Sequence, residues 1–271
     1  MHASKRGSES VAMASPLRPE LILELTKRDF TERFAGSTLG GLWAFVWPLV
    51  NLLVYLIIFS KIMGARLPGQ SNVYAYGVYL TAGLLPWTAF SGTFGRSVGI
   101  FIEKKQIISK LQVSLPSLLL YVSLAETVTF LISMGFFGLF LALTGWSITK
   151  HLILAPFVYV VQQVLAFGLG LLCASLVVFV RDLKEVVGVL LQLWFWFTPI
   201  VYVKDVVPSW LQKLMVFNPA YIVAEAYQKI FVYRTAPDAG PLIVLTLVAH
   251  ALVGVAYAVF RALEKDIRDF L

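Results

Sequence analysis

Two side chains that can carry or lose a proton lie deep inside apolar stretches of this 271-residue sequence. Glu126 lies within the apolar run 115–143, and His250 lies within the run 241–260. An ionisable group at membrane depth is costly, so it often marks a functional site. Glu126 is therefore a candidate for coupling or for lining a pathway. The competing interpretation is a buried acid that is protonated or bonded to a neighbouring hydroxyl.

Other reactive chemistry has few candidates in the sequence. The histidines stand at positions 2, 151 and 250, which does not give a credible Ser–His–Asp or Cys–His set. The sequence contains no G-x-x-x-x-G-K-[ST] phosphate loop and no His/Cys/Asp cluster at metal-ligand spacing. Cys173 is the single cysteine, so no intrachain disulfide can form. We therefore expect no enzyme activity and no cofactor or metal bound by this chain.

The most unusual stretch is 186–234. It begins apolar, gains the run Trp-Phe-Trp-Phe at 194–197 and breaks at the Thr-Pro pair 198–199. Its second half stays apolar but contains Pro208 and Pro219, so it is neither an ordinary surface loop nor a clean span. Non-helical backbone at membrane depth survives only where protein or a water-filled cavity surrounds it. The stretch therefore predicts the mouth of a transport pathway.

The elements that must position these residues are membrane spans. Hydrophobic residues make up 59% of the chain and charged residues 14%, with a mean hydropathy of +0.81. An apolar run of about 18 residues or more is long enough to cross the hydrocarbon core of a bilayer. The sequence predicts an all-α integral membrane protein with six transmembrane helices, at 43–62, 73–94, 115–143, 152–180, 186–203 and 241–260.

The distribution of positive charge predicts the orientation of these spans. With both termini on one side, about 15 of the 22 Lys and Arg residues lie on that side and about 7 on the other. The positive-inside rule therefore places both termini in the cytoplasm. This asymmetry accounts for the net charge of +7 without a nucleic-acid partner.

Three segments are predicted on the cytoplasmic side. Residues 1–16 predict a disordered tail, and residues 17–36 predict an amphipathic interface helix that lies on the membrane or against a partner. Within 96–114, an apolar ridge among charges has the shape that docks into a partner's groove or lies on lipid headgroups. The candidate coupling residues of this segment are Ile100, Phe101, Lys104, Lys105, Ile108 and Leu111.

Three classes of protein compete for this pattern. An ion-coupled secondary carrier needs intramembrane coupling groups and usually shows internal repeats, and only Glu126 offers such chemistry. An anchor or scaffold protein leaves the broken stretch 186–234 unexplained. A membrane subunit driven by a separate ATPase gives the apolar ridge in 96–114 a purpose.

Four short motifs resemble, in order, those of ABC-2 type permeases that export bacterial polysaccharides. They are GGLWAFVWPL at 40–49, GLLPW at 83–87, TPIVY at 198–202 and FNP at 217–219. The resemblance covers nearly the whole chain after the predicted tail, with the six-span domain at 37–271. Among these permeases, the sequence looks most similar to O-antigen exporters of Gram-negative bacteria.

The resemblance implies a homodimer bound to two copies of a separate nucleotide-binding subunit, which carries ATP and Mg. It implies that 96–114 contains the coupling segment and that re-entrant helices form within 204–234, between the fifth and sixth spans. The implied function is ATP-driven export of lipid-linked polysaccharide across the bacterial inner membrane. The alternative is an ABC-2 permease for teichoic acid, a glycolipid or a drug.

A moving glycan needs weak, repeated contacts, because a tight site would trap it. Aromatic rings offer broad platforms for the C–H faces of sugars, although Trp and Tyr also collect at membrane interfaces. The candidates for lining the substrate channel are Trp47, Tyr55, Tyr76, Tyr79, Trp87, Trp194, Trp196 and Tyr202, together with Glu126.

Overall fold

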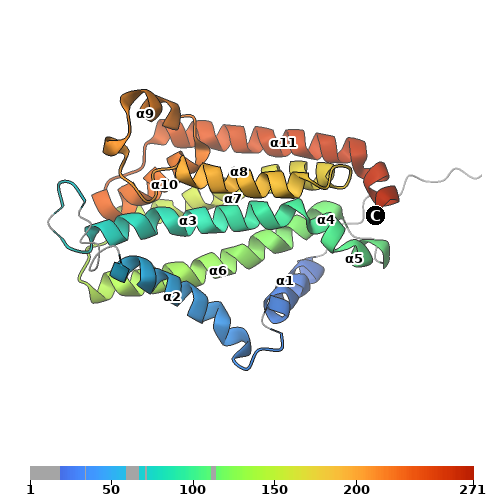
Figure 1. The fold of residues 1–271 in the computed structure, drawn as a ribbon, viewed down its shortest axis with the longest axis horizontal. Coiled ribbons are helices and arrows are strands. Elements are labelled where there is room, and N and C mark those ends of the chain that lie inside the picture. Colours follow the sequence, from blue (N-terminus) through green and yellow to red (C-terminus); the bar gives the residue numbers. More distant parts are fainter. Residues whose placement is uncertain (1–18, 34, 59–66, 71, 111–113) are drawn as a thin grey trace, which may run out of the picture.

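The computed structural model describes residues 19–33, 35–58, 67–70, 72–110 and 114–271. Every regular element in these ranges is helical. Four long helices lie side by side and form the body of a bundle (Figure 1): α3 (Ala75–Val98), α6 (Leu115–Leu143), α7 (Ala155–Val177) and α11 (Ala239–Phe270). The α8 helix (Leu183–Trp196) packs on α3 and α7, and α2 (Trp43–Ile57) crosses α6 and α3 obliquely.

The central element is α3, which contacts α2, α6, α7, α8 and α10 (Pro219–Gln228). Most of its residues are buried, including several Gly, Thr and Ser residues. Small residues allow helices to approach closely within a membrane. Close approach is clearest at Gly170 of α7, where an added Cβ atom would lie 2.6 Å from the Cβ atom of Ser97.

Three helical segments in the described part of the chain are long and apolar enough to cross a membrane by length and composition alone. They are Leu115–Leu143, Lys150–Val177 and Ala239–Phe270. The α3 helix is less apolar because protein rather than lipid surrounds it. The predicted first span reaches residue 62, and its end lies outside the described residues. The finding supports a membrane protein, while the count of six spans stays a prediction.

The predicted third span has the same bounds as α6. Pro116 lies in the first turn of this helix, where its missing N–H is not needed. At the other end, Gly145 adopts a φ of 65° and the Trp146 N–H donates to the Leu141 carbonyl over 2.9 Å. A glycine in the left-handed region with this hydrogen bond is a common helix terminator. Local sequence signals therefore fix both ends of α6.

The predicted fifth span, 186–203, differs from the structure. The α8 helix ends at Trp196, three residues before Pro199. Helical backbone is disfavoured for the residue before a proline, so Pro199 favours an end of the helix before Thr198. At about 1.5 Å per residue, its 14 residues span roughly 21 Å, less than the roughly 30 Å hydrocarbon core. Irregular backbone over 197–203 therefore continues the apolar stretch.

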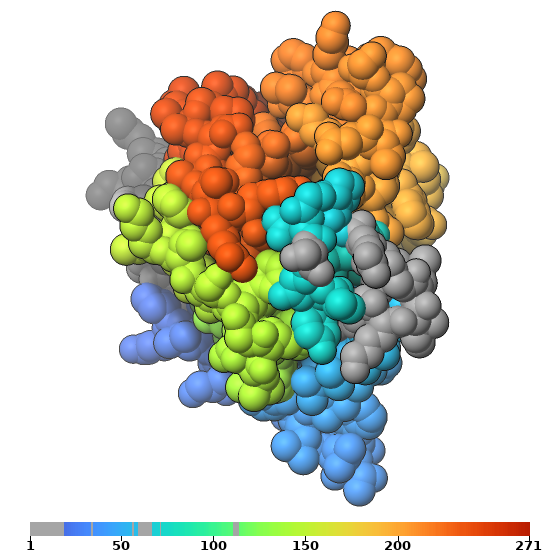
Figure 2. Space-filling view, turned by 90° about the vertical axis from the view of Figure 1, so that its left-hand side faces the viewer, coloured from blue at the N-terminus to red at the C-terminus, as the bar shows by residue number. Residues whose placement is uncertain are grey.

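The chain between α8 and α11 forms a compact unit at one end of the bundle. It contains the short helix α9 (Ser209–Met215), the α10 helix and a π-helical turn at Lys229–Tyr233. The Asn218 side chain accepts hydrogen bonds from the backbone N–H groups of Ala220 and Tyr221 and so caps α10. Figure 2 faces this end and shows the orange segment on the opposite flank from the blue α2.

The opposite end of the bundle carries α1 (Pro19–Arg33), α4 (Ile100–Glu103), α5 (Lys105–Lys110) and the C-terminus (Figure 1). The α1 helix lies within the predicted interface segment and packs against α6. It buries Ile22, Leu25 and Thr26 and leaves most of its charged residues exposed. This end gathers the charges that the apolar body lacks.

Candidate functional site

A groove of about 500 Å³ lies between α1, α2, α3 and α6. We call it the aromatic groove because rings from two helices, including those of Trp47 and Tyr55, line it. The other lining residues add hydroxyl groups, an amide, aliphatic side chains and one guanidinium. The full lining is Phe30, Arg33, Trp43, Ala44, Trp47, Pro48, Asn51, Leu52, Tyr55, Thr81, Leu84, Leu85, Thr88, Thr129 and Ser133.

The polar groups of the groove are held in place by their own helices. The Thr129 and Ser133 hydroxyls donate to the carbonyls of Ala125 and Thr129, respectively, each one turn earlier in α6. The Asn51 amide donates to the Trp47 carbonyl over 3.0 Å. Each hydroxyl keeps lone pairs that can accept a further hydrogen bond. The buried Thr81 hydroxyl has no partner among the described residues. The groove thus combines ring faces with acceptors, which suits a hydroxyl-rich ligand.

Four charged residues form a ring next to the groove, and we call them the charge ring: Asp29 and Arg33 of α1, Arg96 of α3 and Glu126 of α6. Glu126 Oε1 accepts from Arg33 Nη2 at 2.7 Å and from Arg96 Nη1 at 2.6 Å. Asp29 Oδ1 accepts from Arg96 Nη2 at 2.5 Å, and Asp29 Oδ2 lies 3.0 Å from Arg33 Nε. Charges of opposite sign therefore alternate around the ring. Arg33 also lines the aromatic groove, so the two features share one side chain.

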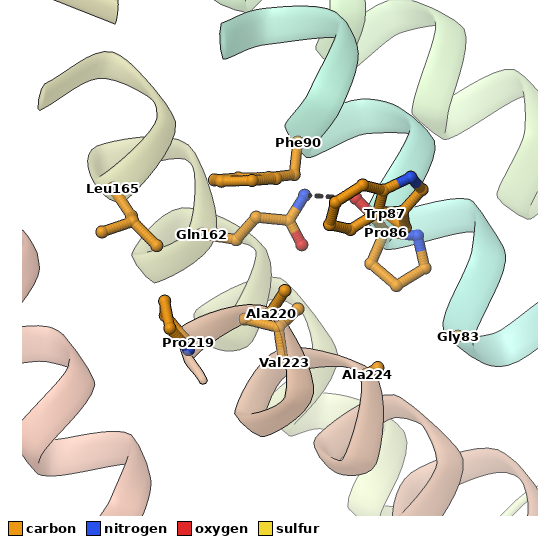
Figure 3. Close-up of a pocket in the computed structure, with 10 residues that line it drawn as sticks. All are labelled: Gly83, Pro86, Trp87, Phe90, Gln162, Leu165, Pro219, Ala220, Val223 and Ala224. Carbon is orange, nitrogen blue, oxygen red and sulfur yellow. Dashed lines mark hydrogen bonds between the residues drawn. The ribbon is translucent and has the colours of Figure 1, made fainter. Parts of the chain in front are cut away.

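Trp87 and Trp194, two predicted channel residues, lie in a separate aromatic cluster with Phe90 and Phe195. The ring centroids of Trp87 and Trp194 are 6.2 Å apart. A cavity of only about 10 Å³ adjoins Trp87 and Phe90, and the Gln162 amide donates to the Pro86 carbonyl beside it over 2.9 Å (Figure 3). A space of this size holds at most about one water molecule. In this structure, the ring of Trp87 packs against protein.

Two predicted channel tyrosines of α3 bind the irregular backbone after α8, and a third lies within that backbone. Tyr76 donates to the Val201 carbonyl, and Tyr79 lies 3.1 Å from the Pro199 carbonyl and 3.2 Å from the Tyr202 carbonyl. The Tyr202 hydroxyl donates to the Trp196 carbonyl over 2.8 Å. Backbone carbonyls without helical partners need such donors at membrane depth. These hydroxyls therefore stabilise the broken segment, whereas Trp196 is 58% exposed on the surface.

The coupling candidates divide into two sets. Ile100, Phe101 and Ile108 are buried in a cluster that includes residues of α1, α6, α7 and α11. Lys104 lies 3.6 Å from Glu32 of α1, and Lys105 is exposed. Leu111 lies outside the described residues. The apolar ridge thus packs into its own chain, and the exposed side of α4 presents Ile102 instead. A coupling role for this segment stays a prediction.

Electrostatic contacts connect α4 to two other helices. Glu103 accepts from Lys184 at the start of α8 over 2.8 Å, and both side chains are about half exposed. A hydrogen bond from Arg28 lowers the pKa of Glu32, and the charge of Lys104 acts in the same direction. Exposed pairs of this kind add little stability. Their importance is geometric, because they connect α4 to α1 and α8.

Sequence reasoning missed the cationic partners of Glu126. A buried carboxylate needs a partner at the same depth, and Arg96 lies in the last turn of α3. The position of Arg96 in the sequence therefore indicates it as a candidate partner of Glu126. Arg33 had no such signal, because it comes from a separate helix 93 residues away in sequence. Among the described residues, no group of three or more His, Cys, Asp or Glu side chains could hold a metal ion.

An all-helical bundle with long apolar helices and a groove between them is typical of a membrane permease. The family model for ABC-2 type transporters matches residues 20–232, and the chain therefore belongs to the ABC-2 type transporter family. Members of this class are transport components rather than enzymes, and the family implies association with an ATPase subunit.

The curated relatives of this chain are named as proteins that export or transport polysaccharides. The chain is 29% identical to the O-antigen export system permease protein RfbA of Myxococcus xanthus, over 92% of this chain and 94% of that protein. It is 28% identical to an RfbA protein of Klebsiella pneumoniae, over 80% and 82% of the two chains. The polysialic acid transport protein KpsM of Escherichia coli is 23% identical, over 88% and 91%.

Proposed function

We propose that this chain is the membrane subunit of an ATP-driven exporter that moves lipid-linked polysaccharide of the O-antigen type from cytoplasm to periplasm. The aromatic groove is the observation in the structure that supports this class of cargo. Its rings offer stacking faces for sugars, and its hydroxyls offer acceptors for sugar O–H groups. Their spread along the groove favours many weak contacts over one tight site, as a moving polymer requires.

In this proposal, two copies of the chain form a homodimer that binds two copies of a separate ATPase subunit. Six spans cross the inner membrane, and both termini and α1 lie in the cytoplasm. The charged end of the aromatic groove then faces the side on which a lipid-linked glycan is delivered. The 197–234 segment lies on the periplasmic side as a re-entrant pair of short helices. The insertion of α10 among α3, α7 and α11 supports that assignment.

Exposed apolar faces support a second copy or lipid around the bundle. Several large side chains on α2 and α8 outside the groove are half exposed or more, including Phe45, Val189, Leu190 and Trp196. A contiguous apolar surface on a membrane protein is covered by lipid or by another protein. We assign the α2 and α8 faces to contacts with the second copy.

The proposal is tested in the native bacterium by deleting the gene and restoring it on a plasmid. We expect the deletion to remove surface polysaccharide and to leave lipid-linked glycan inside the cell, because synthesis continues without export. The double substitution Trp47→Ala and Tyr55→Ala should restore export poorly, since it removes two rings of the groove. Surface polysaccharide and the intracellular lipid-linked pool are both measured by gel and mass spectrometry.

The matched control removes two exposed rings outside the groove, with Phe157→Ala and Tyr257→Ala. We expect these variants to export normally at normal expression. Surface polysaccharide that persists in the deletion strain would reject the proposed cargo. Equal export by the groove variant and the control, at equal expression, would reject the aromatic groove as the path.

A further inference from the structure

We infer that Glu126 is a positioning residue that fixes α1 to α3 and α6 through the charge ring, so that a movement of α1 reaches the aromatic groove. This inference rests on the proposed function for the source of that movement, which is the ATPase partner. It assigns Glu126 a role other than contact with the cargo. Three features support this role: the pairing of the ring, the limited attachment of α1 elsewhere and the niche that holds the carboxylate.

The first feature is the pairing of charges in the ring, in which Asp29 Oδ2 is buried near Arg33 Nε but accepts no hydrogen bond from the described residues. The side chains of Asp29 and Glu126 are about a tenth exposed, and those of Arg33 and Arg96 are 30% and 31% exposed. Each of the four residues contacts two ring neighbours of opposite charge. Removing one partner from a buried pair leaves an uncompensated charge, which is strongly unfavourable. The ring therefore resists the separation of α1 from α3 and α6.

The second feature is the small number of contacts that attach α1 to the bundle apart from the ring. Of its fifteen residues, only Ile22, Leu25 and Thr26 are buried. Leu21 packs partly buried beside them, and α1 also contacts the 3₁₀ turn Gly40–Leu42. A further link is the 3.6 Å contact between Lys104 and Glu32, whose side chain is 45% exposed. A helix with so small an apolar contact is held in orientation by its polar contacts. Asp29 and Arg33 provide these contacts from successive turns of the same face.

The third feature is a niche in α3, at Gly92, that fits the Glu126 carboxylate. A Cβ atom added at Gly92 would lie 2.7 Å from Glu126 Oε2 and 3.1 Å from its Cδ atom. Real Cβ atoms do not approach other atoms so closely, so a residue with a Cβ atom at this position would displace the carboxylate. Gly92 precedes Arg96 by one helical turn, and the two therefore lie on the same face of α3. The niche and the cation together hold Glu126 in one place.

The connection to the groove comes from Arg33. Its guanidinium binds Glu126 and Asp29, and the same side chain lines the aromatic groove beside Phe30. Arg33 also lies 5.6 Å from the Phe30 ring centroid. A displacement of α1 therefore moves two groove residues, and the ring pulls Arg96 and Glu126 in the same direction. Movement at the helix surface is converted in this way into a change in the shape of the groove.

The test compares two variants in the complex of the full chain with its ATPase. Glu126→Gln removes the charge at the centre of the ring. Gly92→Ala leaves every charge in place and displaces the carboxylate. Gly95→Ala is the matched control, because it makes the same change one turn away and its Cβ atom meets only Leu191 at an ordinary 3.4 Å. Hydrogen exchange of the α1 amides reports the attachment of the helix without any cargo.

We expect faster exchange in α1 for Glu126→Gln and for Gly92→Ala, and no change for Gly95→Ala. We also expect both variants to hydrolyse ATP while export per ATP falls about fivefold or more, the usual range of coupling between sites. The double variant Glu126→Gln with Arg33→Gln should be no worse than either single one, because both break the same ring.

Unchanged α1 exchange in both variants would overturn the ring as an attachment, whatever happens to export. Faster exchange with normal export per ATP would overturn its role in coupling. Failure of the proposed cargo appears separately, as a lack of export by the unmodified complex. The exchange measurement does not depend on that cargo, so the two failures are distinguishable.

Discussion

A glycine sets how closely α3 and α7 approach each other. An added Cβ atom at Gly170 would lie 2.6 Å from Ser97, whose side chain is fully buried. We expect Gly170→Ala to destabilise the protein by about 1–3 kcal/mol, the usual cost of overpacking a core. The midpoint of thermal unfolding in detergent measures the effect. Gly188→Ala in α8 has open space around its Cβ atom and should leave the midpoint unchanged.

The two tryptophans of the aromatic run lie in different surroundings. Trp194 donates to Asn218 over 2.7 Å and contacts Phe90, whereas Trp196 is 58% exposed. We expect Trp194→Ala to lower the free energy of unfolding by roughly 2 kcal/mol or more, as large-to-small changes in packed sites do. Trp196→Ala should cost far less.

The same pair separates folding from transport. If Trp196 contributes only to a surface contact, its replacement changes export or dimer formation without lowering the thermal midpoint. Thermal unfolding and export are measured for both single variants at matched expression. Equal destabilisation by the two substitutions would contradict the burial difference and the role of Trp194 in holding Asn218.

At the scale of elements, the short helices α4 and α5 have a buried side and an exposed side, and we propose that the exposed side contacts the ATPase subunit. Phe101 is fully buried, and Ile102 on the other side is 39% exposed. We expect Phe101→Asp to lower stability by about 3 kcal/mol or more, because it removes a buried ring and introduces a charge. Ile102→Asp should fold normally and lose affinity for the ATPase subunit.

Thermal unfolding and co-purification of the ATPase check the two expectations. Phe101→Asp therefore tests folding and cannot by itself show uncoupling. Lys105→Glu, on the same exposed surface, is a second probe of partner contact. If Ile102→Asp and Lys105→Glu both leave ATPase binding and export intact, the docking surface lies elsewhere.

Helix ends show what the sequence can predict. The bounds of α6 could be predicted because Pro116 and Gly145 are local signals. The burial of the ridge in 96–114 within its own chain could not be predicted, because an amphipathic pattern shows which side is apolar but not what covers that side. Pro199 marks the end of α8 locally, whereas the position of the backbone after it depends on Tyr79 and Gln228, whose donors reach the Pro199 carbonyl from distant helices. Local signals give elements, and tertiary contacts decide their partners.

The groove was predictable only in part for the same reason. Trp47 and Tyr55 could be predicted because they are aromatic residues within the predicted first span. Thr129 and Ser133 resemble any hydroxyl that bonds the preceding turn of its own helix, so nothing local marks them as groove residues. Apart from the Asp29–Arg33 pair within α1, the contacts of the charge ring join residues 30 to 93 positions apart. Such a site becomes visible only when α1, α3 and α6 are placed together.

At the scale of the whole molecule, orientation in the membrane is the property that connects the two ends of the bundle. We expect Lys213→Cys to react with a membrane-impermeant maleimide added from the periplasmic side, and Lys265→Cys to react only after the membrane is opened. Both positions are exposed at opposite ends of the structure. The background is Cys173→Ser, which removes the single native thiol. The reverse labelling pattern would place the termini outside.

The enclosure of α3 also has a consequence for how the protein is made. A helix leaving the insertion machinery must partition into lipid on its own hydrophobicity or wait for protein neighbours. The polar residues of α3 become acceptable only when α6, α7 and α10 surround it, and α6 begins 16 residues after α3 ends. We therefore expect stable insertion of α3 to be a late event in biosynthesis. It completes only after the segments that cover it have been translated.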